Sequence, residues 1–151
     1  FITYMILLFL EVTICEKIVK VICAIIENDK SEVLCTLNSK DIIFPVLGIP
    51  GGIINDGESP EKAIVREIGE KLNCKIKVNS LFSATTYEYD DYILNTMVAK
   101  CSILKSIPSS KEYTKLLWLP IEYITSLNWN PTTIPTIDKL IMKYKKNSIS
   151  N

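Results

Sequence analysis

The sequence predicts an α/β (α+β) fold, an α/β/α sandwich in which two helices cover a mixed β-sheet. Apolar runs rich in β-branched residues alternate with turn-forming residues over most of the chain, and two well-separated segments instead show apolar residues at helical spacing. The 151 residues, 48% of them hydrophobic, are enough for one core. We therefore expect one domain over residues 17–147, an apolar extension over 1–16 and a polar tail over 148–151.

The extension reads FITYMILLFLEVTIC and is too short, with Glu11 inside it, to form a transmembrane helix. It also lacks the basic start and small-residue cleavage site of a signal peptide. We expect a strand, a partner-contacting segment or a stretch that is absent from the mature protein. Membrane attachment is not favoured, and a structural or membrane-associated role would have this segment alone in its support.

The domain opens with two β-rich runs, KIVKVICAIIE and SEVLCTL. Asn28, Asp29 and Lys30 lie between them as turn formers, which predicts a hairpin. After a polar insert, NSKD, the run IIFPVLGIPGG contains Pro45 and Pro50, which predicts an irregular strand leading into a loop.

The first helix is predicted from Pro60 to about Asn73, with Ser59 as its N-cap. Apolar residues recur on one side of it at helical spacing, namely Ile64, Val65, Ile68 and Leu72. We expect this side to pack on the sheet.

The second half is predicted to add two long strands, a short strand and two helices. The long strands, KIKVNSLFSATTYEY and YILNTMVAKCSIL, form a hairpin with its turn at Asp90 and Asp91. A short strand, YTKLLWLP, and a short helix, IEYITSLNW, follow. The last helix begins near Pro135 and frays into KKNSISN, and its packing residues are Ile137, Leu140, Ile141 and Tyr144.

Composition excludes several classes of function. Seventeen basic and seventeen acidic residues balance, so no overall positive field is present to bind a nucleic-acid polymer or an anionic membrane. The absence of histidine excludes Ser-His-Asp and Cys-His nucleophiles and His-ligated zinc. The five cysteines include no Cys-x-x-Cys pair and are interpreted as small core residues in a reducing, cytoplasmic compartment.

The most informative pattern surrounds the first helix. Glu67, Glu70 and position 71 fall on one side of it, so two carboxylates point together at the edge of the apolar stripe. Such a pair is a solvated acidic surface when it stands alone, or part of an oxygen site for a hard divalent cation. Here it belongs to a longer pattern of six fixed positions, which are Gly52, Glu58, Arg66, Glu67, Ile68 and Glu70.

This pattern resembles the Nudix box, Gly-x5-Glu-x7-Arg-Glu-aliphatic-x-Glu-Glu-x-Gly-aliphatic, and the resemblance extends from about Lys17 to Leu140. IPGG, GESPEKAIVREI and LNWNPTTIPTIDKL look like the small nucleoside triphosphate diphosphatases of the oxidised-guanine and CTP pyrophosphohydrolase kind. The resemblance implies a Nudix-like sandwich. It also implies hydrolysis of a nucleoside triphosphate, or a related nucleoside diphosphate derivative, to a monophosphate and pyrophosphate with Mg²⁺ or, in its place, Mn²⁺.

The resemblance also assigns roles to individual residues. Glu67 and Glu70 would bind the metal ion, with Glu67 close to the attacking water as well. Arg66 would orient Glu67 by a charge-assisted hydrogen bond. The carbonyl of Gly51 would complete part of the metal shell, and Glu58 would tie the loop to the helix.

Further ligands are implied by the second half. Relatives often supply another carboxylate ahead of a tryptophan, and Glu112 precedes Trp118 with five residues between them, so Glu112 is the candidate. Thr133 stands where relatives often read the base edge. Trp129 is a stacking candidate, although strand aromatics are commonly core residues or cross-strand pairs. The other stacking candidates are Tyr87, Tyr89 and Tyr92.

Four departures leave an alternative open, and one of them is Thr133, which stands where relatives often have Asn or Asp. Lys71 replaces the second glutamate of the acidic pair, where its ammonium could pair with Glu67 and Glu70 and take the place of the metal. Asn73 replaces a glycine, a mild change because asparagine also tolerates the left-handed conformation. VLCTLNS lacks an arginine that relatives direct at the phosphates. The alternative is a weakened or inactive Nudix-fold module that binds a nucleotide or a protein; the base and the oligomeric state are left open.

Overall fold

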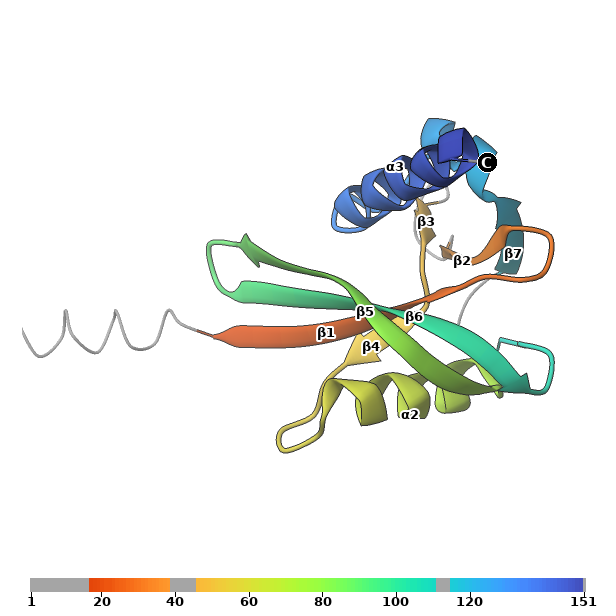
Figure 1. Ribbon diagram of the computed structural model, residues 1–151. Coiled ribbons are helices and arrows are strands. Elements are labelled where there is room, and N and C mark those ends of the chain that lie inside the picture. Colours follow the sequence, from red (N-terminus) through yellow and green to blue (C-terminus); the bar gives the residue numbers. More distant parts are fainter. Residues whose placement is uncertain (1–16, 39–45, 111–114, 151) are drawn as a thin grey trace, which may run out of the picture.

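The computed structural model describes residues 17–38, 46–110 and 115–150 (Figure 1). Predictions for the N-terminal extension, most of the polar insert, Cys15, Pro45 and Glu112 lie outside these residues. Within the described part of the chain, no helix combines the length and the apolar character that crossing a membrane requires.

The central sheet has four strands in the order β4 (Gly51–Ile53), β1 (Ile18–Ile26), β6 (Ile93–Lys105) and β5 (Lys75–Glu88). Strand β1 runs parallel to β6, whereas the other two pairings are antiparallel, so the predicted mixed sheet is confirmed. The predicted hairpin of β5 and β6 is confirmed as well. Strand β4, which carries the two glycines of the motif, lies at the edge of this sheet.

A second, antiparallel sheet consists of β3 (Val46–Gly48), β2 (Glu32–Asn38) and β7 (Lys115–Pro120). The predicted pairing of β1 with β2 is therefore wrong. The chain does turn after β1, but the two runs share one isolated bridge, Glu27 with Val33, and then enter different sheets. Val33 and its next two neighbours are each 0% exposed, and a strand buried on both faces needs more cover than a two-stranded hairpin gives.

Two helices lie on opposite sides of the central sheet, with α2 (Pro60–Leu72) on one side and α3 (Ile134–Ser150) on the other (Figure 1). The second sheet lies on the α3 side (Figure 1). The predicted α/β/α sandwich is confirmed. The short predicted helix is a 3₁₀ helix, η1 (Ile121–Ser126).

The bounds of α2 follow from its local sequence. Ser59 has an extended backbone, and its Oγ accepts a hydrogen bond from the Lys62 amide at 3.2 Å, which caps the first turn. Asn73 ends the helix in the left-handed conformation, at φ 51° and ψ 43°. Both ends were predicted.

Helix α3 continues to Ser150, past the point where fraying was predicted. The hydroxyl of Ser148 donates to the Lys145 carbonyl at 2.9 Å, and that of Ser150 donates to the Lys146 carbonyl at 3.0 Å. Both bonds are made within the last two turns of the helix.

The core has two parts, one on each face of the central sheet. Helix α2 packs its predicted stripe, Ile64, Ile68 and Leu72, into a cluster with residues of β1, β5 and β6. On the opposite face, α3 packs with β2, β3 and η1. The described cysteines are free thiols that are buried or half-buried, as predicted, namely Cys23, Cys35, Cys74 and Cys101. The packing of α2 on the central sheet places the second half of this helix over β4.

Candidate active site

The two glycines of β4 allow α2 to approach this edge strand closely. Gly52 pairs with Ile22 and Gly51 with Cys23 in β1. A Cβ atom on Gly52 would overlap the carboxylate of Glu67, which therefore lies directly on the glycine backbone. Glu67 is 7% exposed, so this acidic side chain is almost completely buried.

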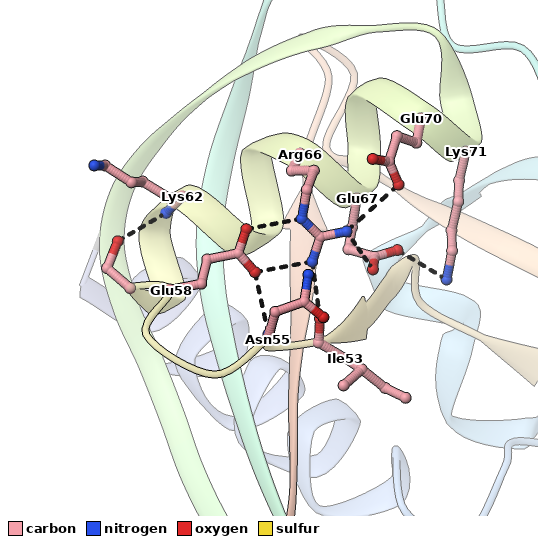
Figure 2. A network of polar contacts seen from close by, with 9 residues as sticks. Ile53, Asn55, Glu58, Lys62, Arg66, Glu67, Glu70 and Lys71 are labelled. Atoms are coloured by element: carbon pink, nitrogen blue, oxygen red, sulfur yellow. Dashed lines mark hydrogen bonds and ion pairs between the residues drawn. The ribbon is translucent and has the colours of Figure 1, made fainter.

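Arg66 connects the loop after β4 to the middle of α2 (Figure 2). Its Nε donates to Glu58 Oε2 at 2.8 Å and its Nη2 donates to Glu58 Oε1 at 2.9 Å, a bidentate pair. Nη2 also donates to the Ile53 carbonyl at 3.0 Å. The hydrogen bonds from Arg66 hold the pKa of the Glu58 carboxyl below its ordinary value of 4.5, with a smaller contribution from the Asn55 amide. Arg66 thus ties the last part of the loop, at Glu58, to the middle of α2.

The remaining guanidinium nitrogen of Arg66 faces the acidic pair. Nη1 lies 2.9 Å from Glu67 Oε1 and 3.4 Å from Glu70 Oε2 (Figure 2). Hydrogen bonds to Glu58 and Glu67 raise the pKa of Arg66 further, so it stays charged. The structure brings Arg66, Glu67 and Glu70 together, as the roles implied by the resemblance require.

Lys71 extends from the last turn of α2 toward β4. Its Nζ donates to the Gly51 carbonyl at 2.8 Å and lies 3.1 Å from Glu67 Oε2. That oxygen is buried and accepts no hydrogen bond within the described residues, although the ammonium is close. The lysine therefore stands between the two oxygens, Gly51 O and Glu67 Oε2, that were predicted to share a metal ion.

The donor atoms suit a hard cation in kind, because carboxylate and carbonyl oxygens are the usual ligands of Mg²⁺. A buried carboxylate oxygen with no hydrogen bond is what an oxygen site for a cation provides. The described residues contain no cluster of three Asp, Glu or Cys side chains able to hold a metal ion. The side chain of Glu70 is 63% exposed and directed at Arg66 instead. The oxygens thus fit a metal, but Lys71 already takes one position among them.

The predicted substrate residues lie in another layer. Trp129 is 6% exposed in the core beneath α3, and its indole nitrogen donates to the Ile124 carbonyl at 2.7 Å. Thr133 precedes α3, and its carbonyl accepts from the Ile137 amide at 3.1 Å. Neither belongs to the polar network around Arg66, and substrate contact by either stays a prediction. The three tyrosines named as stacking candidates contact one another instead, and they are Tyr87, Tyr89 and Tyr92.

One residue beside the site was missed from the sequence. Cys23 pairs with Gly51 across β1 and β4, and its thiol leaves no room for a Cβ atom on that glycine. Burial raises the pKa of this thiol to about 11, against the opposing effect of the Lys71 charge. The contact depends on strand pairing between distant segments, so no local sequence signal marks it.

The family model of the NUDIX domain matches residues 17–140 of this sequence. The chain belongs to the Nudix family. The predicted resemblance is thereby confirmed, and the loop with the second half of α2 is its Nudix box.

Its relatives include nucleotide-hydrolysing members of the family. The chain is 29% identical to an 8-oxo-dGTP diphosphatase of Escherichia coli K12 over 82% of its own length and 97% of that protein. It is 25% identical to nucleoside triphosphatase NudI of Enterobacter sp. strain 638, over 75% and 89% of the two chains. Among solved structures, the Nudix hydrolase MutT of methicillin-resistant Staphylococcus aureus 252 has a TM-score of 0.70 at 32% identity, covering 85% and 98%.

Proposed function

We propose that this Nudix hydrolase cleaves a nucleoside triphosphate to a nucleoside monophosphate and pyrophosphate, or a related nucleoside diphosphate derivative to a nucleoside monophosphate and the phosphate ester of its other group. Mg²⁺ is the proposed cofactor, with Mn²⁺ able to replace it. The observation that carries the proposal is the Glu67 carboxylate, which Arg66 holds by one oxygen against the backbone of Gly52. A free nucleotide as partner and a cytoplasmic location belong to the same proposal.

In this proposal the chain positions groups around the phosphates. Glu67 and Glu70 would hold Mg²⁺, joined by Glu112 as the resemblance implies, whereas the Gly51 carbonyl, which the resemblance also assigns to the metal, accepts a hydrogen bond from Lys71. A divalent ion bound there would offset phosphate charge and lower the pKa of a bound water. Arg66 holds Oε1 of Glu67 at 2.9 Å, so that this carboxylate keeps one position relative to the attacking water.

The reaction is a displacement at phosphorus. The oxygen of a water molecule forms a bond to phosphorus, the bond from that phosphorus to the bridging oxygen breaks, and the bridging oxygen leaves with the pyrophosphate. The water loses a proton on the way, and Glu67 is the carboxylate placed beside it. No imidazole base is required, which suits a chain without histidine.

The test measures nucleoside monophosphate formation from nucleoside triphosphates, 8-oxo-dGTP, ADP-ribose and dinucleoside polyphosphates, with pyrophosphate and phosphate release from the triphosphates, while Mg²⁺ or Mn²⁺ is varied. We expect turnover that requires the metal. Glu67→Gln should reduce kcat by at least about 100-fold, the usual cost of removing one group that stabilises developing charge. Glu70→Gln should reduce it less, because that side chain is 63% exposed.

Glu61→Gln is the matched control, since Glu61 is an exposed acid of the same helix outside the network of Arg66. It should leave kcat unchanged. Absence of hydrolysis of every compound by the native chain would overturn the proposal in favour of a binding module. Full activity in Glu67→Gln would overturn the assignment of this residue.

A further inference from the structure

The ammonium of Lys71 lies in a largely enclosed position between the carbonyl oxygen of Gly51 and Oε2 of Glu67. The Lys71 side chain is 23% exposed and that of Glu67 is 9% exposed, so this ion pair is largely shielded from water. The Gly51 carbonyl, which belongs to the edge strand, accepts the hydrogen bond from Nζ. Lys71 thereby bridges the last turn of α2 and β4, the two elements that frame the site.

The charges around Glu67 determine what the Lys71 ammonium does at this position. Two cations flank the Glu67 carboxylate, with Arg66 at Oε1 and Lys71 at Oε2, at 2.9 and 3.1 Å. A carboxylate this deeply buried is costly without a positive neighbour. Here the Lys71 ammonium supplies that positive neighbour at Oε2, at 3.1 Å.

The same balance weakens the attraction for free divalent cations. The ion-paired cluster contains two positive side chains, Arg66 and Lys71, and three negative ones, Glu58, Glu67 and Glu70. Its net charge is one negative. A glutamate at position 71 would make that three, and would also vacate the position beside the Gly51 carbonyl.

We propose that the Lys71 ammonium is a built-in cation that takes the place of one divalent ion between Gly51 O and Glu67 Oε2. The nucleotide-free protein then binds divalent cations weakly. The metal ion that serves hydrolysis enters with the nucleotide, whose phosphate oxygens supply the ligands that the protein lacks. This inference deepens the proposed function, because it concerns the same site, but its test needs neither a nucleotide nor turnover.

The test measures binding of Mn²⁺ alone to the nucleotide-free full chain, by the electron paramagnetic resonance signal of free Mn²⁺. Native protein should bind Mn²⁺ weakly, and Lys71→Glu should bind it at least about tenfold more tightly. The control is Lys62→Glu, which makes the same charge change at an exposed position on α2. It should bind as the native protein does. Equal affinity of native protein and Lys71→Glu would overturn the inference.

A second variant covers the case in which Lys71→Glu fails to fold. Lys71→Met keeps the length of the side chain but leaves Glu67 Oε2 without its cation. The Tm of this variant should be below that of the native protein in a chelator and should rise when Mg²⁺ is added, whereas the native Tm should respond to neither. A variant Tm that does not respond to Mg²⁺ would overturn the inference, and a native protein without hydrolytic activity would affect the proposed function alone.

Discussion

Gly51 and Gly52 are adjacent in the sequence, yet the space left by their missing side chains serves different neighbours. A Cβ atom on Gly51 would collide with the Ile22 carbonyl, which is backbone and cannot move away alone. A Cβ atom on Gly52 would meet the carboxylate of Glu67, which is the end of a flexible side chain. The missing side chain of Gly51 therefore allows β4 to pair with β1, and that of Gly52 leaves room for the carboxylate of Glu67.

We expect Gly51→Ala to lower the free energy of unfolding by about 1–3 kcal/mol, as overpacking usually does. Gly52→Ala should cost less stability but should reduce kcat by at least about tenfold, because it displaces Glu67 from the site. Urea unfolding and nucleotide hydrolysis, measured on both variants, separate the two effects. The distinction fails if Gly52→Ala is the less stable variant or retains native kcat.

At the scale of residues, the resemblance implied the contact of Arg66 with Glu67 and named the Gly51 carbonyl. Lys71 was named as a cation that could take the position of the metal. The acceptor at Ile53 was not named, because it is a carbonyl, which every residue carries. Whether Glu112 completes the site stays a prediction.

At the scale of elements, α2 ends at a residue that adopts the left-handed conformation. Asn73 adopts φ 51° and ψ 43° at the position where the family pattern has glycine. This left-handed conformation places Cβ near the following carbonyl, a cost that asparagine tolerates better than most residues. The end of the helix, and with it the turn that carries Lys71, depends on this tolerance.

Asn73→Ala should therefore lower the free energy of unfolding by about 1 kcal/mol. Asn73→Gly should not lower it, because glycine has no Cβ to strain. Thermal unfolding of the two variants beside native protein gives the comparison. Equal losses in both variants would mean that the asparagine side chain, and not the backbone conformation, stabilises this end.

Elements set by neighbouring residues were predictable and those set by distant pairing were not. The cap at Ser59 and the stop at Asn73 both lie in the sequence next to the helix they bound. One of the two partners of β2, in contrast, is β7, some eighty positions along the chain, with Leu34 opposite Trp118. A turn after β1 predicted a hairpin, but the burial of β2 on both faces decided its place in the second sheet.

At the scale of the whole molecule, the free thiols are distributed through both parts of the core. Cys101 packs on the α2 side of the central sheet and Cys35 on the α3 side. Burial raises the pKa of Cys101 from 9.0 to about 11 and that of Cys35 to about 12. Both thiols therefore stay neutral in the folded protein at a pH where unfolded thiols ionise.

Stability should consequently fall as the pH rises above 9, toward about 11 for Cys101 and about 12 for Cys35. In this range the unfolded chain binds fewer protons than the folded chain, which costs about 1.4 kcal/mol per pH unit for each thiol. Urea unfolding at a series of pH values should show a shallower alkaline slope for Cys101→Ala. Its stability difference from native protein should stay constant below pH 9, and an unchanged alkaline slope would refute the effect.

The architecture as a whole was predictable from alternation and periodicity, because strand-like runs with two distant helical segments have few compact arrangements. The division into two sheets was not, since it depends on which strands pair. One core on each face of the central sheet lets α2 and the motif pack independently of α3. This separation also explains why Thr133 and Trp129, which were grouped with the site by resemblance, lie apart from the network of Arg66.

The loop that precedes α2 is already held at both of its ends before any ligand arrives. Glu58 holds Arg66 by two hydrogen bonds, and the Asn55 amide donates to the same carboxylate at 3.2 Å. A loop held in this way loses less conformational entropy on binding than a free loop does. We therefore expect the association rate constant of a nucleotide to be set by diffusion and orientation, as for other rigid surfaces, and not by the time this loop takes to close.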